Sequence, residues 1–132
     1  MPRTLGVGLG PFAPTAYTIL RIVAGLLFAC HGAQKLFGVL GGHRAPLASQ
    51  LGAAGIIEFV GGLLIAIGFL TWIVALIAAG EMAVAYFQVH LPRGLWPIQN
   101  GGELAVLYCF LFLYIATRGA GKWGVQRGAT KR

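Results

Sequence analysis

The stretch Gly55-Ile56-Ile57-Glu58-Phe59-Val60-Gly61-Gly62 sets a glutamate inside an apolar helix, with glycines on the same helical face. Glu58 shares a stripe with Gly55, three residues before it, and with Gly61 and Gly62, three and four residues after it. Small residues let neighbouring helices approach closely in a membrane, and a carboxyl group among them points toward protein rather than lipid. The stretch therefore predicts a packed helix face that buries a carboxyl group.

The composition of the whole chain is that of an integral membrane protein. Of its 132 residues, 58% are hydrophobic and 10% are charged, whereas soluble domains average about 45–50% apolar and about 25% charged residues. The net charge is +7, and half of the ten basic residues lie near the C-terminus, where they are not interleaved with stacking side chains on one element. This distribution argues against a nucleic acid as partner and favours contact with the lipid bilayer.

Outward from Glu58, the sequence predicts four membrane-spanning helices. The apolar block 51–91 is about twice as long as a helix that crosses the roughly 30 Å hydrocarbon core, so it must contain two spans. The turn between them is expected at Gly68-Phe69-Leu70-Thr71-Trp72. We predict an all-α, antiparallel four-helix bundle with a lead-in at 1–14, a domain at 15–118 with spans at about 15–37, 51–69, 72–91 and 100–117, and a basic tail at 119–132.

The basic residues near the span ends predict how the bundle is oriented. Cytoplasmic segments of membrane proteins carry an excess of Lys and Arg, and here the excess lies on the side of the two termini. The termini are therefore expected to be cytoplasmic. Arg21, less than two turns inside the first span, is expected to reach the membrane surface as an anchor. The residues compared are Arg3, Arg118, Lys122, Arg127, Lys131 and Arg132 on the terminal side and Lys35, Arg44 and Arg93 on the other.

This topology gathers polar side chains in the outer half of the bundle, where they would line a chamber. A carboxyl group in hydrocarbon must be neutral, paired or liganded, and we expect these side chains to partner one another. The alternative, that they only fix the register of the helices, stays open. The candidates for proton relay or for hydrogen bonding to a headgroup are Glu58, Glu103, His31 and Glu81, and the candidates for binding a cofactor are Lys35, Gln88, His90 and Asn100.

The sequence contains no motif that identifies a metal site. A metal ion and a haem both stay open as alternative ligands. The sequence lacks the Glu-x-x-His motifs on paired helices that are typical of di-iron bundles. His31 or His90 could serve as an axial haem ligand, but no more specific motif accompanies them. Cys30 and Cys109 form no C-x-x-C pair and are expected to pack as small hydrophobic residues.

Several spaced motifs give the chain a family resemblance from Ala16 to Trp123. They are His31-Gly32-Ala33-Gln34-Lys35-Leu36, Glu58 with Gly61-Gly62, Glu81-Met82, His90, Asn100-Gly101-Gly102-Glu103 and Gly119-Ala120-Gly121-Lys122-Trp123. With these motifs the chain resembles the DoxX family. A serine and an acid usually follow the last motif in that family, whereas Gly124, Val125 and Gln126 stand here.

The resemblance implies a small four-helix protein of the bacterial inner membrane. It also implies a membrane redox accessory, as a quinone-linked or a thiol and sulfur oxidoreductase component, with a quinone as ligand and a redox protein as partner. Two alternatives stay open beside it: a protein that binds or transports a small solute or metal ion, and a scaffold subunit of a membrane complex. In each case we expect a homo-oligomer or a complex subunit, and whether the chain itself is an enzyme stays undecided.

Overall fold

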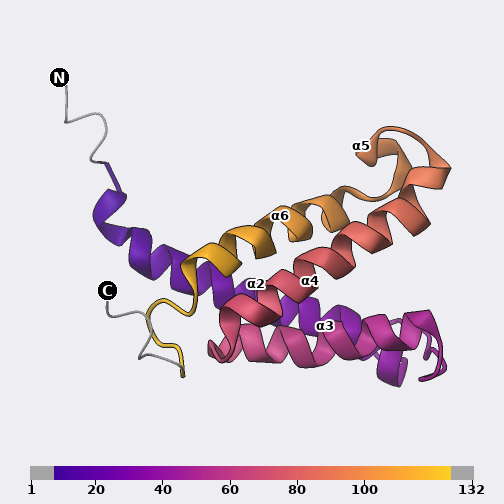
Figure 1. Cartoon of the computed structure of the whole chain (residues 1–132), viewed down its shortest axis with the longest axis horizontal. Coiled ribbons are helices and arrows are strands. Elements are labelled where there is room, and N and C mark those ends of the chain that lie inside the picture. The colour runs from indigo at the N-terminus through magenta and orange to yellow at the C-terminus, as the bar shows by residue number, and fades with distance from the viewer. Residues whose placement is uncertain (1–7, 126–132) are drawn as a thin grey trace.

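The computed structural model describes residues 8–125, and in that range the regular structure is helical, with no strand. Four α-helices dominate it, and short helical turns precede the first and connect the last two (Figure 1). The elements are η1 (Gly10–Phe12), α2 (Ala13–Phe37), α3 (Gln50–Ile67), α4 (Thr71–Ala85), η2 (Tyr86–His90), η3 (Leu91–Arg93), α5 (Pro97–Asn100) and α6 (Glu103–Arg118).

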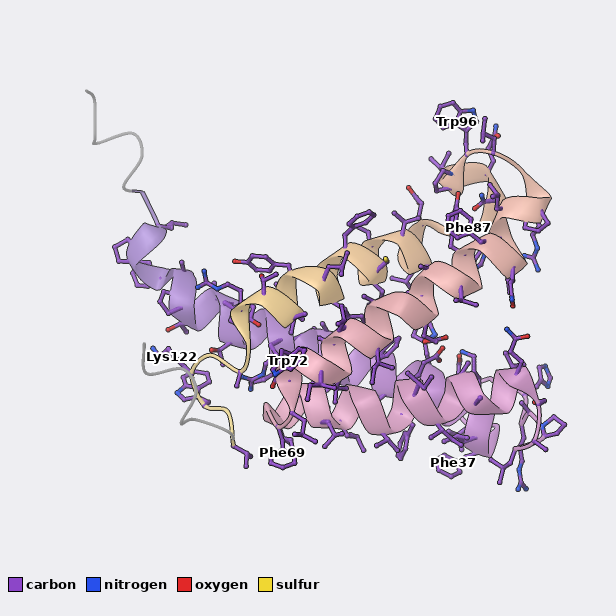
Figure 2. The ribbon with its side chains drawn as sticks, viewed as in Figure 1. Phe37, Phe69, Trp72, Phe87, Trp96 and Lys122 are labelled. Carbon is purple, nitrogen blue, oxygen red and sulfur yellow. The ribbon has the colours of Figure 1, made fainter. Side chains whose placement is uncertain are left out.

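Three helical segments within residues 8–125 are long and apolar enough to cross a membrane: Gly10–Phe37, Gln50–Ile67 and Thr71–Arg93. Helix α6 is also apolar but has 16 residues, slightly short of the roughly 20 that a perpendicular crossing needs. Large apolar side chains are exposed along all of these helices, Trp72 and Phe87 among them, and Phe37 and Phe69 project outward (Figure 2). The chain is therefore an all-helical membrane protein.

Local signals set the helix boundaries. The Ser49 side chain accepts a hydrogen bond from the Gly52 amide at 3.0 Å, which caps the N-terminus of α3. Gly38 and Gly68 follow the last residues of α2 and α3 with φ of 69° and 76°, a left-handed conformation that glycine adopts without a steric cost. The predicted turn after the second span is thus confirmed at Gly68.

The helices pack as two pairs, α2 with α3 and α4 with α6. The pairs lie close together where α3 turns into α4 and diverge toward their other ends (Figure 1). We call the first end, where α2 begins and α6 finishes, the closed end, and the opposite end the open end.

Glycines bring α2 and α3 into backbone contact. A Cβ atom on Gly25 would lie 2.6 Å from the Gly62 carbonyl oxygen, and one on Gly62 would lie 2.5 Å from the Ala29 nitrogen. The stripe around Glu58 is buried together with that carboxyl group, since Gly55, Gly61 and Gly62 are all buried. The predicted packed face of this helix is therefore confirmed.

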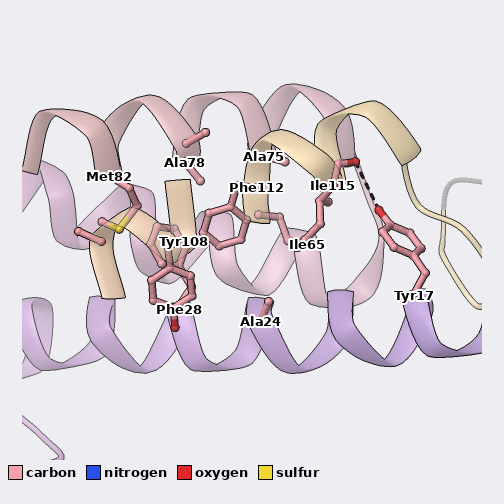
Figure 3. Close-up of a cluster of buried hydrophobic side chains, with 12 residues drawn as sticks. Tyr17, Ala24, Phe28, Ile65, Ala75, Ala78, Met82, Tyr108, Phe112 and Ile115 are labelled. Carbon is pink, nitrogen blue, oxygen red and sulfur yellow. Dashed lines mark hydrogen bonds between the residues drawn. The ribbon is translucent and has the colours of Figure 1, made fainter. Parts of the chain in front are cut away.

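An apolar core joins the two pairs at and near the closed end (Figure 3). Phe28 of α2 packs against Phe112 of α6 with ring centroids 4.7 Å apart, and Tyr108 stacks on Phe112 at 5.3 Å. Ile65 from α3 and alanines from α4 complete this cluster.

The span expected at 72–91 lies within the helical segment Thr71–Arg93, and the observed helices differ from the predicted spans in two details. The span expected at 72–91 is an α-helix only to Ala85, after which Tyr86–His90 form a π-helical turn. The span expected to begin at Asn100 begins at Glu103, because Gly101 with φ of 78° ends the short helix α5 first. The first seven residues of the expected lead-in, with Arg3, and the tail residues Arg127, Lys131 and Arg132 lie outside the described residues.

Candidate functional site

An ion pair between α2 and α3 forms the centre of the site. Lys35 Nζ lies 2.7 Å from Glu58 Oε1, and the side chains of Lys35 and Glu58 are 23% and 3% exposed. The glycine stripe places this pair, because Gly55 lets the Lys35 side chain lie directly against α3. Lys35 is thus the ion-pair partner of the buried Glu58 carboxylate.

Two further predicted residues surround this pair. The Glu81 carboxyl group of α4 is close enough to that of Glu58 for a hydrogen bond between them, and it also feels the charge of Lys35. Two carboxyl groups can share such a bond only when one of them carries a proton. His31 of α2 lies near both Lys35 and Glu58 and meets the edge of the Tyr108 ring at 6.0 Å between centroids.

The cluster stands in the wall of a partly open pocket of about 900 Å³ between the two helix pairs. The pocket is lined by His31, Lys35, Glu58 and Glu81, by Gln50, Gln88 and His90 toward the open end, and by apolar residues including Phe28, Ile57, Ile77, Val84, Leu104 and Tyr108. Glu81 Oε1 is buried and has no hydrogen-bond partner. The site therefore combines an apolar wall with a small group of charged side chains and one free acceptor.

The π-helical turn places two more of the predicted residues on the pocket wall. Gln88 accepts a hydrogen bond from Gln50 Nε2, which links the turn after α4 to the start of α3. His90 Nδ1 lies 3.3 Å from the Asn100 carbonyl oxygen. An extra residue in the helical turn shifts the side chains that follow it, and this shift was not visible in the sequence.

Two predicted site residues lie outside the pocket lining. Asn100 is buried, but its side chain is used within the connection before α6: its amide donates to Tyr86 Oη at 3.1 Å and to the Gly94 carbonyl at 2.9 Å, and its oxygen accepts from the Gly102 amide at 2.8 Å. Glu103 is exposed at the first turn of α6, while Leu104 and Ala105 face the pocket. The expectation that all three carboxyl groups meet in one chamber is therefore wrong for Glu103, because its position on α6 turns it away.

The structure also corrects the prediction for Arg21. Instead of reaching the membrane surface, the side chain is fully buried at the closed end, where its guanidinium donates to backbone carbonyls. The residues after α6 fold back over it. No pattern near Arg21 in the sequence could reveal a cover formed by residues almost 100 positions later.

Within residues 8–125, no group of three or more His, Cys, Asp or Glu side chains is arranged to hold a metal ion. The cluster around Glu58 contains a lysine in direct contact with the carboxylate, and an ammonium group competes with a cation for the same oxygen atoms. Its arrangement is better suited to hydrogen bonding and proton exchange than to metal coordination.

Comparison with known proteins places this site in a family. The sequence model of the DoxX family matches residues 16–91, more than half of the chain. The chain belongs to the DoxX family. An uncharacterised protein of Haemophilus influenzae is 42% identical to it over 120 residues, which cover 86% of this chain and 90% of that protein. No solved structure matches the chain significantly. The DoxX match covers His31, Lys35, Glu58 and Glu81, so the whole charged cluster lies within the family region.

Proposed function

We propose that this DoxX protein crosses the bacterial inner membrane four times, as an antiparallel bundle of α2, α3, α4 and α6 with both termini in the cytoplasm. The apolar character of α6 supports the fourth crossing, since its 16 residues together with the helical turn before it approach the length of a span. Arg118 and Lys122 lie at the closed end and Lys35, Arg44 and Arg93 toward the open end. Counted over the whole sequence, more basic residues belong to the side of the two termini than to the other side. This excess supports a closed end that faces the cytoplasm.

We further propose that the pocket binds a quinone and that the protein serves as a membrane redox accessory. One observation carries this proposal: a buried carboxyl oxygen of Glu81 without a partner stands beside the Lys35–Glu58 pair in a pocket whose remaining wall is largely apolar. Ligand sites typically combine an apolar wall with a few convergent polar groups. The volume of about 900 Å³ accommodates a ring headgroup and the first part of an isoprenoid tail.

The residues of the chain suggest how such a ligand would be held. A quinone supplies two-electron chemistry, and its electrons would come from or go to a partner protein or a second bound substrate. The Lys35 ammonium can donate a hydrogen bond to a carbonyl oxygen of the ring, and Glu81 can accept one from a hydroxyl. When one of the neighbouring Glu58 and Glu81 carboxyl groups carries a proton, that group can give the proton to the headgroup and the other can accept one.

Binding to the purified full-length protein in lipid nanodiscs tests this proposal. Gly80 lines the pocket, and a Cβ atom added there meets nothing within 4 Å, so Gly80→Leu is chosen to place a larger side chain at the pocket wall where its Cβ atom has open space. We expect Gly80→Leu to weaken binding of a short-chain ubiquinone or menaquinone analogue at least about tenfold, the equivalent of 1.4 kcal/mol, and Glu81→Gln to weaken it measurably. The fold of each variant is checked by circular dichroism.

Glu103→Gln is the matched control, because it removes an exposed carboxyl group that does not line the pocket. It should bind the analogue as the wild type does. Wild-type affinity in Gly80→Leu, or no binding of either quinone class to the wild type, would contradict the proposal. A solute or metal ion that binds instead, with loss in Gly80→Leu, would favour the binding or transport alternative.

A further inference from the structure

A fully buried arginine lies at the closed end and pairs with backbone carbonyls. Arg21 of α2 is 0% exposed. Its Nη2 donates to the Ala66 carbonyl at 3.1 Å, and its Nη1 donates to the carbonyls of Lys122, at 3.1 Å, and Ala120. No carboxylate of the described residues forms an ion pair with it. A buried guanidinium without such partners would be very costly in a membrane, so these carbonyls must be held firmly in place.

The acceptors come from both helix pairs. Ala66 lies in the last turn of α3, where helix carbonyls lack partners and carry a partial negative charge. Ala120 and Lys122 belong to residues 119–125, which we call the strap and which follow α6. The strap folds back beside the first half of α2, where Figure 2 shows Lys122. Arg21 therefore ties α2 and the end of α3 to the segment that leaves α6.

Further hydrogen bonds hold the strap in the same position. Tyr17 Oη donates to the Gly119 carbonyl at 2.6 Å, and Thr18 Oγ1 accepts from the Lys122 amide at 3.1 Å. The Val125 amide donates to the Ile67 carbonyl at 3.0 Å. Gly121 permits this approach, because a Cβ atom there would lie 3.0 Å from the Tyr17 ring.

We infer that Arg21 and the strap form a clasp that seals the closed end of the helices, so that the pocket can be reached only from the open end or from the bilayer. The apolar core lies between the clasp and the pocket, with Ala24 and Phe28 one and two turns beyond Arg21 on α2. The clasp gives the Gly119-Ala120-Gly121-Lys122-Trp123 motif a role: its backbone supplies carbonyls for Arg21. That the clasp closes this end of the helices does not depend on any ligand. That a quinone enters the pocket from the open end or from the bilayer rests on the proposed function.

Hydrogen exchange measured by mass spectrometry on the full-length protein in nanodiscs tests the clasp. Arg21→Met keeps most of the side-chain volume and removes the five donors, and Arg21→Lys keeps the charge but not the planar fork. We expect exchange of residues 119–125 to rise by about ten- to a hundredfold in Arg21→Met, as loss of hydrogen bonds to a charged group predicts, and to rise less in Arg21→Lys. Arg44→Met, at an exposed arginine near the open end, should leave it unchanged.

Should Arg21→Met fail to fold, Tyr17→Phe and Thr18→Val each remove one hydroxyl of the clasp at little cost in volume, and each should also accelerate exchange of the strap. Unchanged exchange in a folded Arg21→Met, or in both hydroxyl variants, would overturn the clasp. This outcome is distinct from failure of quinone binding, which is measured on other variants.

Thiol accessibility tests the sealing. In a protein with Cys30 and Cys109 replaced by alanine, a single cysteine is placed at Ala24, which is 4% exposed between clasp and pocket. A charged, membrane-impermeant thiol reagent added from the closed-end side should not label it in sealed vesicles, and should label it after Arg21→Met or Tyr17→Phe. Labelling of Ala24→Cys with Arg21 and Tyr17 intact would contradict a sealed end.

Discussion

At the scale of single residues, the Lys35–Glu58 pair stabilises the fold by compensating a buried charge. Glu58 is almost fully buried and Lys35 is its ion-pair partner. Removing one member of a buried pair leaves an uncompensated charge, which typically costs about 3–5 kcal/mol. We predict that Lys35→Met lowers the free energy of unfolding by about 3 kcal/mol, the low end of that range, because the Lys35 side chain is partly exposed.

The double variant Lys35→Met with Glu58→Gln provides the check on this prediction. It removes both charges, so it should recover part of the loss. Unfolding in mixed detergent micelles, followed by circular dichroism, measures all variants in one cycle. A double variant less stable than Lys35→Met alone would mean that the pair does not act as a unit.

At the scale of elements, the contact between α2 and α3 depends on glycines that face backbone. A Cβ atom on Gly62 would lie 2.5 Å from backbone atoms of α2, and backbone cannot yield as a flexible side chain does. We predict that Gly62→Ala destabilises the protein by about 1–3 kcal/mol, the usual cost of overpacking, in the same unfolding assay.

Gly80→Ala is the control for this substitution, because it adds the same methyl group to a helix at a place with open space around it. It should be neutral or slightly stabilising, since alanine favours the helix more than glycine does. Equal losses in the two variants would show that helix propensity, and not the contact between α2 and α3, determines the effect.

Helical spacing explains why part of the site was predictable. The stripe around Glu58 fixes which face of α3 is buried, and helical direction places His31, Lys35 and Glu81 at similar depth. The same reasoning gave the wrong orientation for Glu103. It is the first residue of α6, and no helical turn of α6 precedes it whose apolar pattern would show which way its side chain points. Helical spacing could not predict the burial of Arg21, because the strap that covers it is distant in the sequence. It also could not predict the π-helical turn, because no residue type indicates one.

At the scale of the whole molecule, the two helix pairs lie close together at the closed end and diverge toward the open end (Figure 1). A pocket lies between the two pairs. This arrangement places the charged cluster between an apolar seal and an open mouth. If the proposed clasp and the proposed ligand site hold, such a protein would take up its ligand from the bilayer without opening a path through the membrane.

Photolabelling of the wild-type protein in nanodiscs with a photoreactive quinone analogue, mapped by mass spectrometry, tests the pocket most directly. The account predicts labelled residues within 50–58 and 77–90, competition by unmodified quinone, and loss of the label in Gly80→Leu. Label spread over exposed side chains of α6 such as Leu107 and Phe110, or unchanged labelling in Gly80→Leu, would contradict it.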